Sequence, residues 1–144
     1  PREVKEKLDR KDNFLLFDNR VKGSIASIEN GGLDFLSANC SCAMPLYLVT
    51  STKGGVVQMY DTRMMKSVAN CNLGAPLKQF DVHKQLPFAV GLTTEIVSFS
   101  FENGTLTPEK QDTGLGIDAF ALHQNESSCA VRIGNIVKCC VIDY

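Results

Sequence analysis

The sequence predicts an all-β fold built from repeated antiparallel sheets of four strands each, and three observations support this prediction. Short segments in which apolar and polar residues alternate follow one another along the chain, as expected for half-buried strands. Tight turns rich in glycine or asparagine separate these segments, which is typical of β-hairpins. Two sequence patterns also recur at nearly the same spacing.

The recurring patterns set the size of the repeated unit. Residues 17–20 (FDNR) are echoed by residues 60–63 (YDTR), 43 residues later. Residues 77–83 (LKQFDVH) are echoed by residues 117–123 (IDAFALH), 40 residues later. A period of about 40–45 residues with four strands per repeat is typical of the blades of a WD40-type β-propeller.

This period divides the chain into blades. We expect the last two strands of one blade at residues 14–29, full blades at residues 32–73 and 76–113, and three strands of a further blade at residues 117–144. The charged segment 1–12 is expected to be a linker, a frayed segment or a short helix. The prediction is a partial propeller of about three to four blades over residues 13–144, cut from a longer chain. Its open edge strands would let it self-associate.

The composition excludes several classes of protein. The 144 residues carry a formal net charge of -1, whereas nucleic-acid-binding domains usually show a clustered basic excess. No apolar run approaches the roughly 20 residues that cross a bilayer, and the charged N-terminus does not resemble a signal peptide. We therefore expect no nucleic-acid partner, no membrane insertion and a cytoplasmic location.

The cysteines and histidines do not predict a metal site or an active site. The six cysteines lack the paired spacing of structural zinc sites, so buried free thiols on strands are expected. The two histidines, His83 and His123, stand at equivalent places in neighbouring repeats. A repeat produces such a pair, whereas a catalytic site needs a nucleophile and an acid that converge on one base. We expect turn-capping or packing histidines, no enzymatic activity, no metal and no cofactor.

The most patterned polar residues are Asp18 with Arg20 and Asp61 with Arg63. Positions i and i+2 of a strand share one face, so each Asp and Arg are expected to lie side by side where the third strand of a blade ends. One interpretation is structural, with each pair tying its blade to the following loop. The other is a contact surface for a protein partner.

One protein family shows this order of motifs. Residues 56–68 (VVQMYDTRMMKSV) resemble a segment in the C-terminal WD40 propeller of the raptor family, the scaffolds of TOR complex 1. The resemblance continues through residues 77–83, through Phe120, Leu122, His123, Ala130 and Val131, and upstream through residues 16–20, so that it covers residues 14–144. The chain departs from the family where Lys84 and Gln124 replace a proline after each histidine.

The resemblance implies a non-catalytic scaffold of nutrient and growth signalling. Its partner would be the TOR kinase complex, and its location the cytoplasm with recruitment to the lysosomal surface. The alternative is another WD40 adaptor, such as a ubiquitin-ligase substrate receptor that docks through Arg20 and Arg63, because an Asp-x-Arg pair at this place is also a docking signal in such adaptors.

Overall fold

The computed structural model describes residues 2–5, 14–18, 24–28, 34–102 and 104–144, with side chains described from residue 34 onward. Every regular element in this part of the chain is a strand. The strands are β1 (Arg2–Lys5), β2 (Phe14–Asp18), β3 (Ser24–Ile28), β4 (Phe35–Ser41), β5 (Met44–Thr52), β6 (Val56–Asp61), β7 (Lys66–Asn72), β8 (Gln79–Val82), β9 (Phe88–Leu92), β10 (Ile96–Glu102), β11 (Thr105–Lys110), β12 (Ala119–Leu122), β13 (Ser128–Ile133) and β14 (Ile136–Val141).

The strands form four antiparallel sheets, which we number as blades 1 to 4. Blade 1 has the order β1-β2-β3, blade 2 β4-β5-β6-β7, blade 3 β8-β9-β10-β11 and blade 4 β12-β13-β14. The two full blades and the three strands of blade 4 fall in the ranges that the sequence predicts. The partial propeller of antiparallel sheets is therefore confirmed.

The segment expected to be a linker, a frayed segment or a short helix contains strand β1, which pairs with β2 through Glu3 opposite Phe17. Blade 1 therefore has three strands in the structure, where two were expected. The alternation of apolar residues did not predict this strand because β1 lies at the edge of the described sheet. Edge strands tolerate charged residues, and a charged segment has the hydropathy of a loop. The boundary between residues 12 and 13 stays a prediction.

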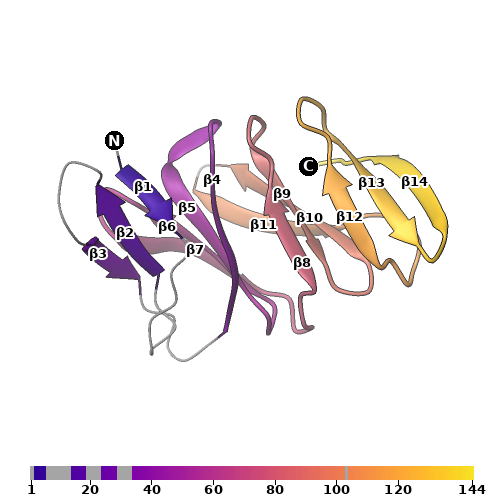
Figure 1. Ribbon diagram of the computed structural model, residues 1–144, viewed down its shortest axis with the longest axis horizontal. Coiled ribbons are helices and arrows are strands. Elements are labelled where there is room, and N and C mark those ends of the chain that lie inside the picture. Colours follow the sequence, from indigo (N-terminus) through magenta and orange to yellow (C-terminus); the bar gives the residue numbers. More distant parts are fainter. Residues whose placement is uncertain (1, 6–13, 19–23, 29–33, 103) are drawn as a thin grey trace.

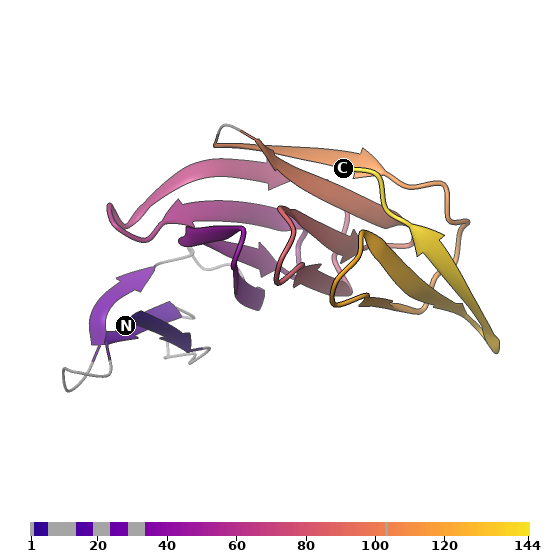
Figure 2. The same cartoon turned by 90° about the horizontal axis from the view of Figure 1, so that it is seen from above.

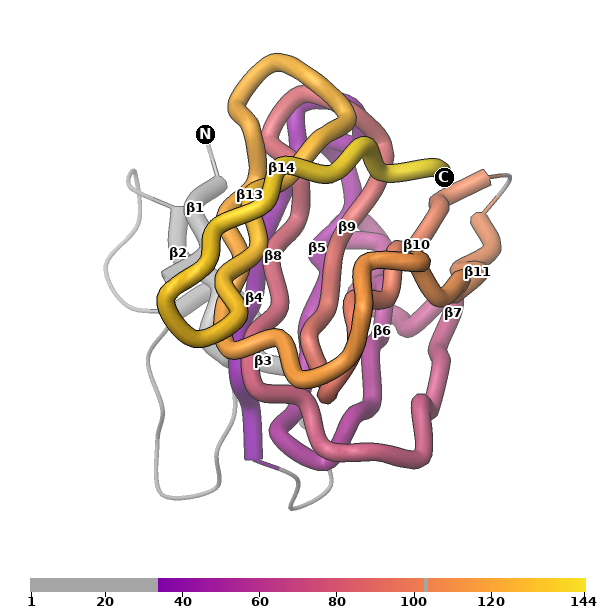
Figure 3. The backbone as a smooth tube through the Cα atoms, turned by 90° about the vertical axis from the view of Figure 1, so that its right-hand side faces the viewer, coloured from indigo at the N-terminus to yellow at the C-terminus, as the bar shows by residue number. Residues whose placement is uncertain are grey.

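The blades stand in a row with equivalent strands side by side. The first strands β4, β8 and β12 are neighbours, and the outer strands β7 and β11 also contact each other (Figure 1). Figure 2 shows the four sheets following one another as an open arc. Figure 3 looks along this row, with β4 and β8 on one side and β7 and β11 on the other.

The core lies between consecutive blades. Blades 2 and 3 enclose a cluster in which the rings of Phe80 and Phe99 meet edge to face, with their centroids 5.5 Å apart. Blades 3 and 4 enclose a second cluster around Phe88, Ile96 and Phe120. All five residues of β9 are buried, since blade 3 has a neighbour on each face. Full burial of one such phenylalanine contributes about 1.5–3 kcal/mol.

Glycine sets one of the turns that hold this row together. Gly55 closes the turn between β5 and β6 with a φ of 96°, a conformation that residues with a side chain rarely adopt. A Cβ atom at this position would lie 2.1 Å from the carbonyl oxygen of Ala75 in the β7–β8 connection. The glycine therefore allows blade 2 to approach that connection closely.

Candidate protein-interaction surface

Asp61 ends strand β6 and organises the turn that follows it. Its side chain is 2% exposed, and its Oδ1 accepts the backbone N–H groups of Arg63 at 2.8 Å and Met64 at 3.4 Å. The guanidinium of Arg63 donates from Nη2 to Oδ2 at 2.8 Å and from Nε to Oδ1 at 3.2 Å. The Met65 N–H closes the turn on the Asp61 carbonyl at 2.8 Å. One carboxylate thus holds both the backbone and the side chain of this turn.

The ion pair controls the protonation of Asp61. The hydrogen bond from the Arg63 side chain lowers the pKa of Asp61 from 3.8 to about 2, with further lowering by the backbone N–H groups of Arg63 and Met64, while burial opposes the shift. The same bond raises the pKa of Arg63. Both groups are therefore ionised at neutral pH.

Three exposed side chains surround this turn. The side chain of Arg63 is 58% exposed although its guanidinium is bonded to Asp61. Met64 is 57% exposed and Leu46 42% exposed. The amide and the hydroxyl of Thr62 both donate to the Leu46 carbonyl at 2.9 Å, which fixes the start of β5 beside the turn. Leu46, Arg63 and Met64 form what we call the Arg63 surface.

The structure brings together one of the two predicted Asp/Arg pairs and leaves the other undescribed. Asp61 and Arg63 are in contact, as expected. The expected shared strand face is wrong, because Arg63 lies in the turn beyond β6 and the Asp61 carboxylate caps that turn. Asp18 ends β2 as Asp61 ends β6, and its side chain is not described. Arg20 lies outside the described residues.

His83 joins two blades, a role that sequence reasoning missed. Its Nδ1 accepts the N–H groups of Gln85 at 3.1 Å and Leu86 at 2.9 Å, as the expected turn-capping role requires. The Nε2 must then carry the proton that bonds the carbonyl of His123 at 2.7 Å. The ring also stacks on Phe88 with centroids 4.9 Å apart. The 40-residue spacing of the histidines was the signal that could have revealed this contact.

Gln79 forms a second polar link between the same blades, through two hydrogen bonds. Its side-chain amide donates to the carbonyl of Phe120 at 2.8 Å and accepts the N–H of Phe120 at 3.2 Å. The amide thus satisfies both backbone groups as a neighbouring strand would. No sequence signal distinguishes this glutamine, because its partner is backbone.

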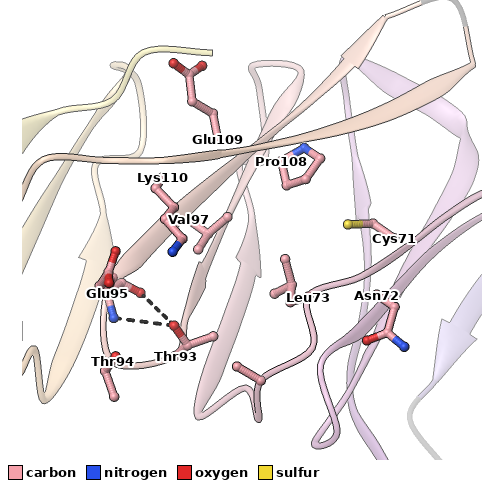
Figure 4. A pocket seen from close by; sticks show the side chains of 11 residues that line it. Cys71, Asn72, Leu73, Thr93, Thr94, Glu95, Val97, Pro108, Glu109 and Lys110 are labelled. Carbon is pink, nitrogen blue, oxygen red and sulfur yellow. Dashed lines mark hydrogen bonds between the residues drawn. The ribbon is translucent and has the colours of Figure 1, made fainter.

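A groove of about 400 Å³ lies between the outer strand of blade 2 and blade 3. Cys71, Leu73, Val97 and Pro108 form apolar walls, and the charged Glu95 and Lys110 also line it (Figure 4). Burial raises the pKa of the Cys71 thiol, which makes it a weak nucleophile. Thr93 Oγ1 is occupied by the Glu95 backbone, at 3.4 Å from its N–H. This lining does not bring an activated nucleophile and a base together.

The described residues include no metal-binding cluster and no membrane-spanning helix. No group of three His, Cys, Asp or Glu side chains there stands close enough to hold a metal ion. The six cysteines are free thiols, but the expected burial is wrong for most of them. Cys129 is buried, whereas Cys40, Cys42 and Cys139 are exposed, and Cys42 lies in the turn between β4 and β5. The same part of the chain contains no helix long and apolar enough to cross a bilayer.

Comparisons with known proteins place the fold. No protein family and no curated protein matches the sequence. Among solved structures, Raptor from Chaetomium thermophilum aligns with a TM-score of 0.67 and 16% identity over 83% of this chain and 12% of that chain. The β-propeller domain of Cps50 (Swd1) from Myceliophteria thermophila aligns with a TM-score of 0.71 and 10% identity over 84% of this chain and 42% of that chain.

The C-terminal WD40 domain of Sif2 aligns equally well, with a TM-score of 0.71, 7% identity, and 87% of this chain covered against 38% of that chain. The chain therefore spans less than half the length of each of these three structures. Identities this low carry the fold and nothing finer. The chain is a partial WD40-type β-propeller.

Proposed function

We propose that this protein is a non-catalytic scaffold that binds protein partners through the Arg63 surface. The proposal depends on one observation about the turn after β6. The Asp61 side chain is buried and ionised, whereas the side chains of Arg63 and Met64, which follow it, are 58% and 57% exposed. A turn whose backbone and arginine are already held in place loses little conformational freedom on binding, and the methionine beside it can adapt its shape to a partner. Arginine and methionine are also enriched at protein interfaces.

At a finer level, we propose a raptor-like role in TOR complex 1, with a cytoplasmic location and recruitment to the lysosomal surface. The order of motifs over residues 14–144 supports it, and the shared fold with Raptor over 83% of the chain is compatible with it. A tagged protein should then co-purify with the TOR kinase after gentle lysis. Absence of the kinase from the purified material would refute the raptor-like role.

The contribution of the Arg63 surface is tested by Arg63→Ala combined with Met64→Ser. The double variant removes the ion pair of Asp61 but keeps its bonds from the backbone N–H groups of residues 63 and 64, so it should fold, which circular dichroism checks, while it loses the kinase. Glu126→Ala, an exposed change in the β12–β13 loop, is the matched control and should retain it. Equal recovery of the kinase with all three proteins would place the contact elsewhere.

A ubiquitin-ligase substrate receptor is the second candidate, favoured by the Asp-x-Arg pair at the end of β6. In that case Arg20→Ala with Arg63→Ala should abolish binding of the ligase adaptor and leave the circular dichroism spectrum unchanged. Unaltered adaptor binding would reject this candidate.

A further inference from the structure

Strand β7 is the outer strand of blade 2, and the described sheet has no strand paired to its outer edge. The Leu73 N–H donates to the Gly55 carbonyl at 2.9 Å, so the backbone groups of Leu73 face β6. Backbone groups alternate in direction along an antiparallel strand. The N–H and C=O groups of Asn70 and Asn72 therefore point outward from the sheet. This edge lies between blades 2 and 3, both of which have four described strands.

The outer strand of blade 3 is protected against further pairing, whereas β7 is not. The Gln111 N–H donates to the Ile96 carbonyl at 2.9 Å, so by alternation the nitrogen of Pro108 in β11 is directed away from the sheet. A proline at that position removes no bond to β10 and prevents another strand from pairing there. Strand β7 has no proline, and its single charged residue, Lys66, is its first residue. Proteins usually protect exposed edges with charges or proline, so the edge of β7 is open to an added strand.

The groove of about 400 Å³ lies beside the last residues of β7. Cys71 and Leu73 pack against the core between blades 2 and 3 and form one wall of the groove, and Val97 and Pro108 form the facing wall (Figure 4). A strand paired to β7 would place the residue opposite Cys71 on the same face of the sheet as Cys71. The side chain of that residue would enter the groove, which has room for one large apolar side chain.

Lys110 places a positive charge at one end of this groove. It lies opposite Val97 in the β10–β11 ladder, so both side chains are on the face of blade 3 that lines the groove. Among the described residues, neither Lys110 nor Glu95 of the groove lining makes an ion pair. Lys110 is exposed whereas Glu95 is half-buried, so a ligand that arrives from solvent meets the ammonium group first. In Figure 4, Lys110 and Cys71 lie toward opposite ends of the groove, with Leu73 between them.

We propose that the edge of β7 binds an extended segment of another protein in which an acidic residue is followed, two positions later, by an apolar residue. The segment pairs antiparallel with β7 through the outward backbone groups of Asn70 and Asn72. Its apolar side chain lies opposite Cys71 and fills the groove. Residues two positions apart share one face of a strand, so the acidic side chain lies beside Leu73 and reaches Lys110.

This site and the Arg63 surface lie at opposite ends of one strand. Strand β7 begins with Lys66, three residues after Arg63, and ends with Asn72 at the groove. At about 3.3 Å per residue the strand is roughly 20 Å long, so a partner bound at one end leaves the other end accessible. The proposal is therefore independent of the proposed function.

Fluorescence polarisation with a labelled peptide tests the site. The probe is a threonine-rich peptide of about nine residues, a composition that favours an extended strand, with one glutamate and a leucine two positions after it. The wild type should bind this probe saturably, and should bind a peptide with lysine in place of the glutamate about tenfold more weakly or less. Lys110→Glu should reverse this preference. Absence of saturable binding, or a preference that Lys110→Glu leaves unchanged, overturns the proposal.

A proline in β7 tests the pairing itself. Asn70→Pro removes an outward N–H and keeps the bonds from β7 to β6, so it should weaken binding of the probe by about tenfold or more. Asn70→Thr keeps that N–H and should bind as the wild type does, and circular dichroism checks that both variants fold. Arg63→Ala with Met64→Ser should also bind the probe normally, which separates this site from the Arg63 surface.

Two outcomes contradict the pairing with a segment of another protein. Equal binding of the probe by the proline and threonine variants would show that the segment does not pair with β7. A wild type that sedimentation velocity finds self-associated, and that Asn70→Pro returns to a monomer, would show that a second copy of this chain occupies the edge.

Discussion

Replacing Gln79 with leucine tests whether hydrogen bonds between blades hold this row of sheets together. The amide of Gln79 accepts the Phe120 N–H and donates to the Phe120 carbonyl. Leucine has a similar size, so the substitution removes both bonds without opening a large cavity. The two backbone groups of Phe120, which face β8 and not β13, then lose their partners.

The magnitude follows from the number of bonds. A typical hydrogen bond contributes about 1 kcal/mol net to stability, and leaving a partly buried backbone group unpaired adds to that cost. Two bonds and a half-buried site give an expected loss of about 2–3 kcal/mol in the free energy of unfolding. The same change at Gln124, an exposed loop residue, should cost less than about 0.5 kcal/mol.

Urea unfolding followed by circular dichroism measures both variants, and hydrogen exchange of the Phe120 amide gives a local readout. We expect a lower unfolding midpoint with an unchanged slope for Gln79→Leu, together with faster exchange at Phe120. A Gln79→Leu protein as stable as Gln124→Leu, with unchanged exchange at Phe120, would refute the role of this amide.

Three further predictions concern the turn, the thiols and the glycines. The pKa of Asp61 is lowered in the folded state to about 2, so its ionised form contributes stability above about pH 4, and this contribution is lost as the pH falls toward 2. The melting temperature of the wild type should therefore exceed that of Asp61→Asn by less and less as the pH falls from 4 to 2. A difference in melting temperature that stays constant would contradict the lowered pKa. Burial raises the pKa of Cys129 to about 11, so mass spectrometry should find maleimide on exposed Cys42 long before Cys129, and equal rates would contradict the burial. Gly55→Ala should lower the free energy of unfolding by about 2 kcal/mol or more, because the Ala75 carbonyl lies close and the φ of Gly55 is positive. Gly104→Ala is the control, with a φ of 73° and no described atom within 4 Å of the added Cβ, and should cost about 1 kcal/mol. Equal losses of unfolding free energy would contradict the crowding at Gly55.

The blade frame was predictable because two independent signals coincide in this sequence. The 40-residue repeat placed His83 and His123 at equivalent positions, and the alternation of apolar residues placed the strands of blades 2 and 3 between the turns. Strand β1 was not predicted because charged edge strands lack the alternation of apolar and polar residues that marks a half-buried strand. Its pairing depends on β2, which lies several residues further along the chain.

The candidate site was predictable in part. The contact between Asp61 and Arg63 was expected from their spacing, but its geometry was not, since it arises in a turn capped by a carboxylate. The bond from His83 to the His123 carbonyl joins residues 40 positions apart. Contacts of this kind depend on how blades dock, and local sequence patterns do not report docking.

The most direct test of the proposed scaffold is a hydrogen–deuterium exchange footprint of the protein with and without the partner that co-purifies with it. Binding through the Arg63 surface should slow exchange in peptides covering residues 44–47 and 61–66, and leave residues 93–97 of the groove unchanged. Protection confined to the groove, with residues 61–66 unaffected, would contradict the account.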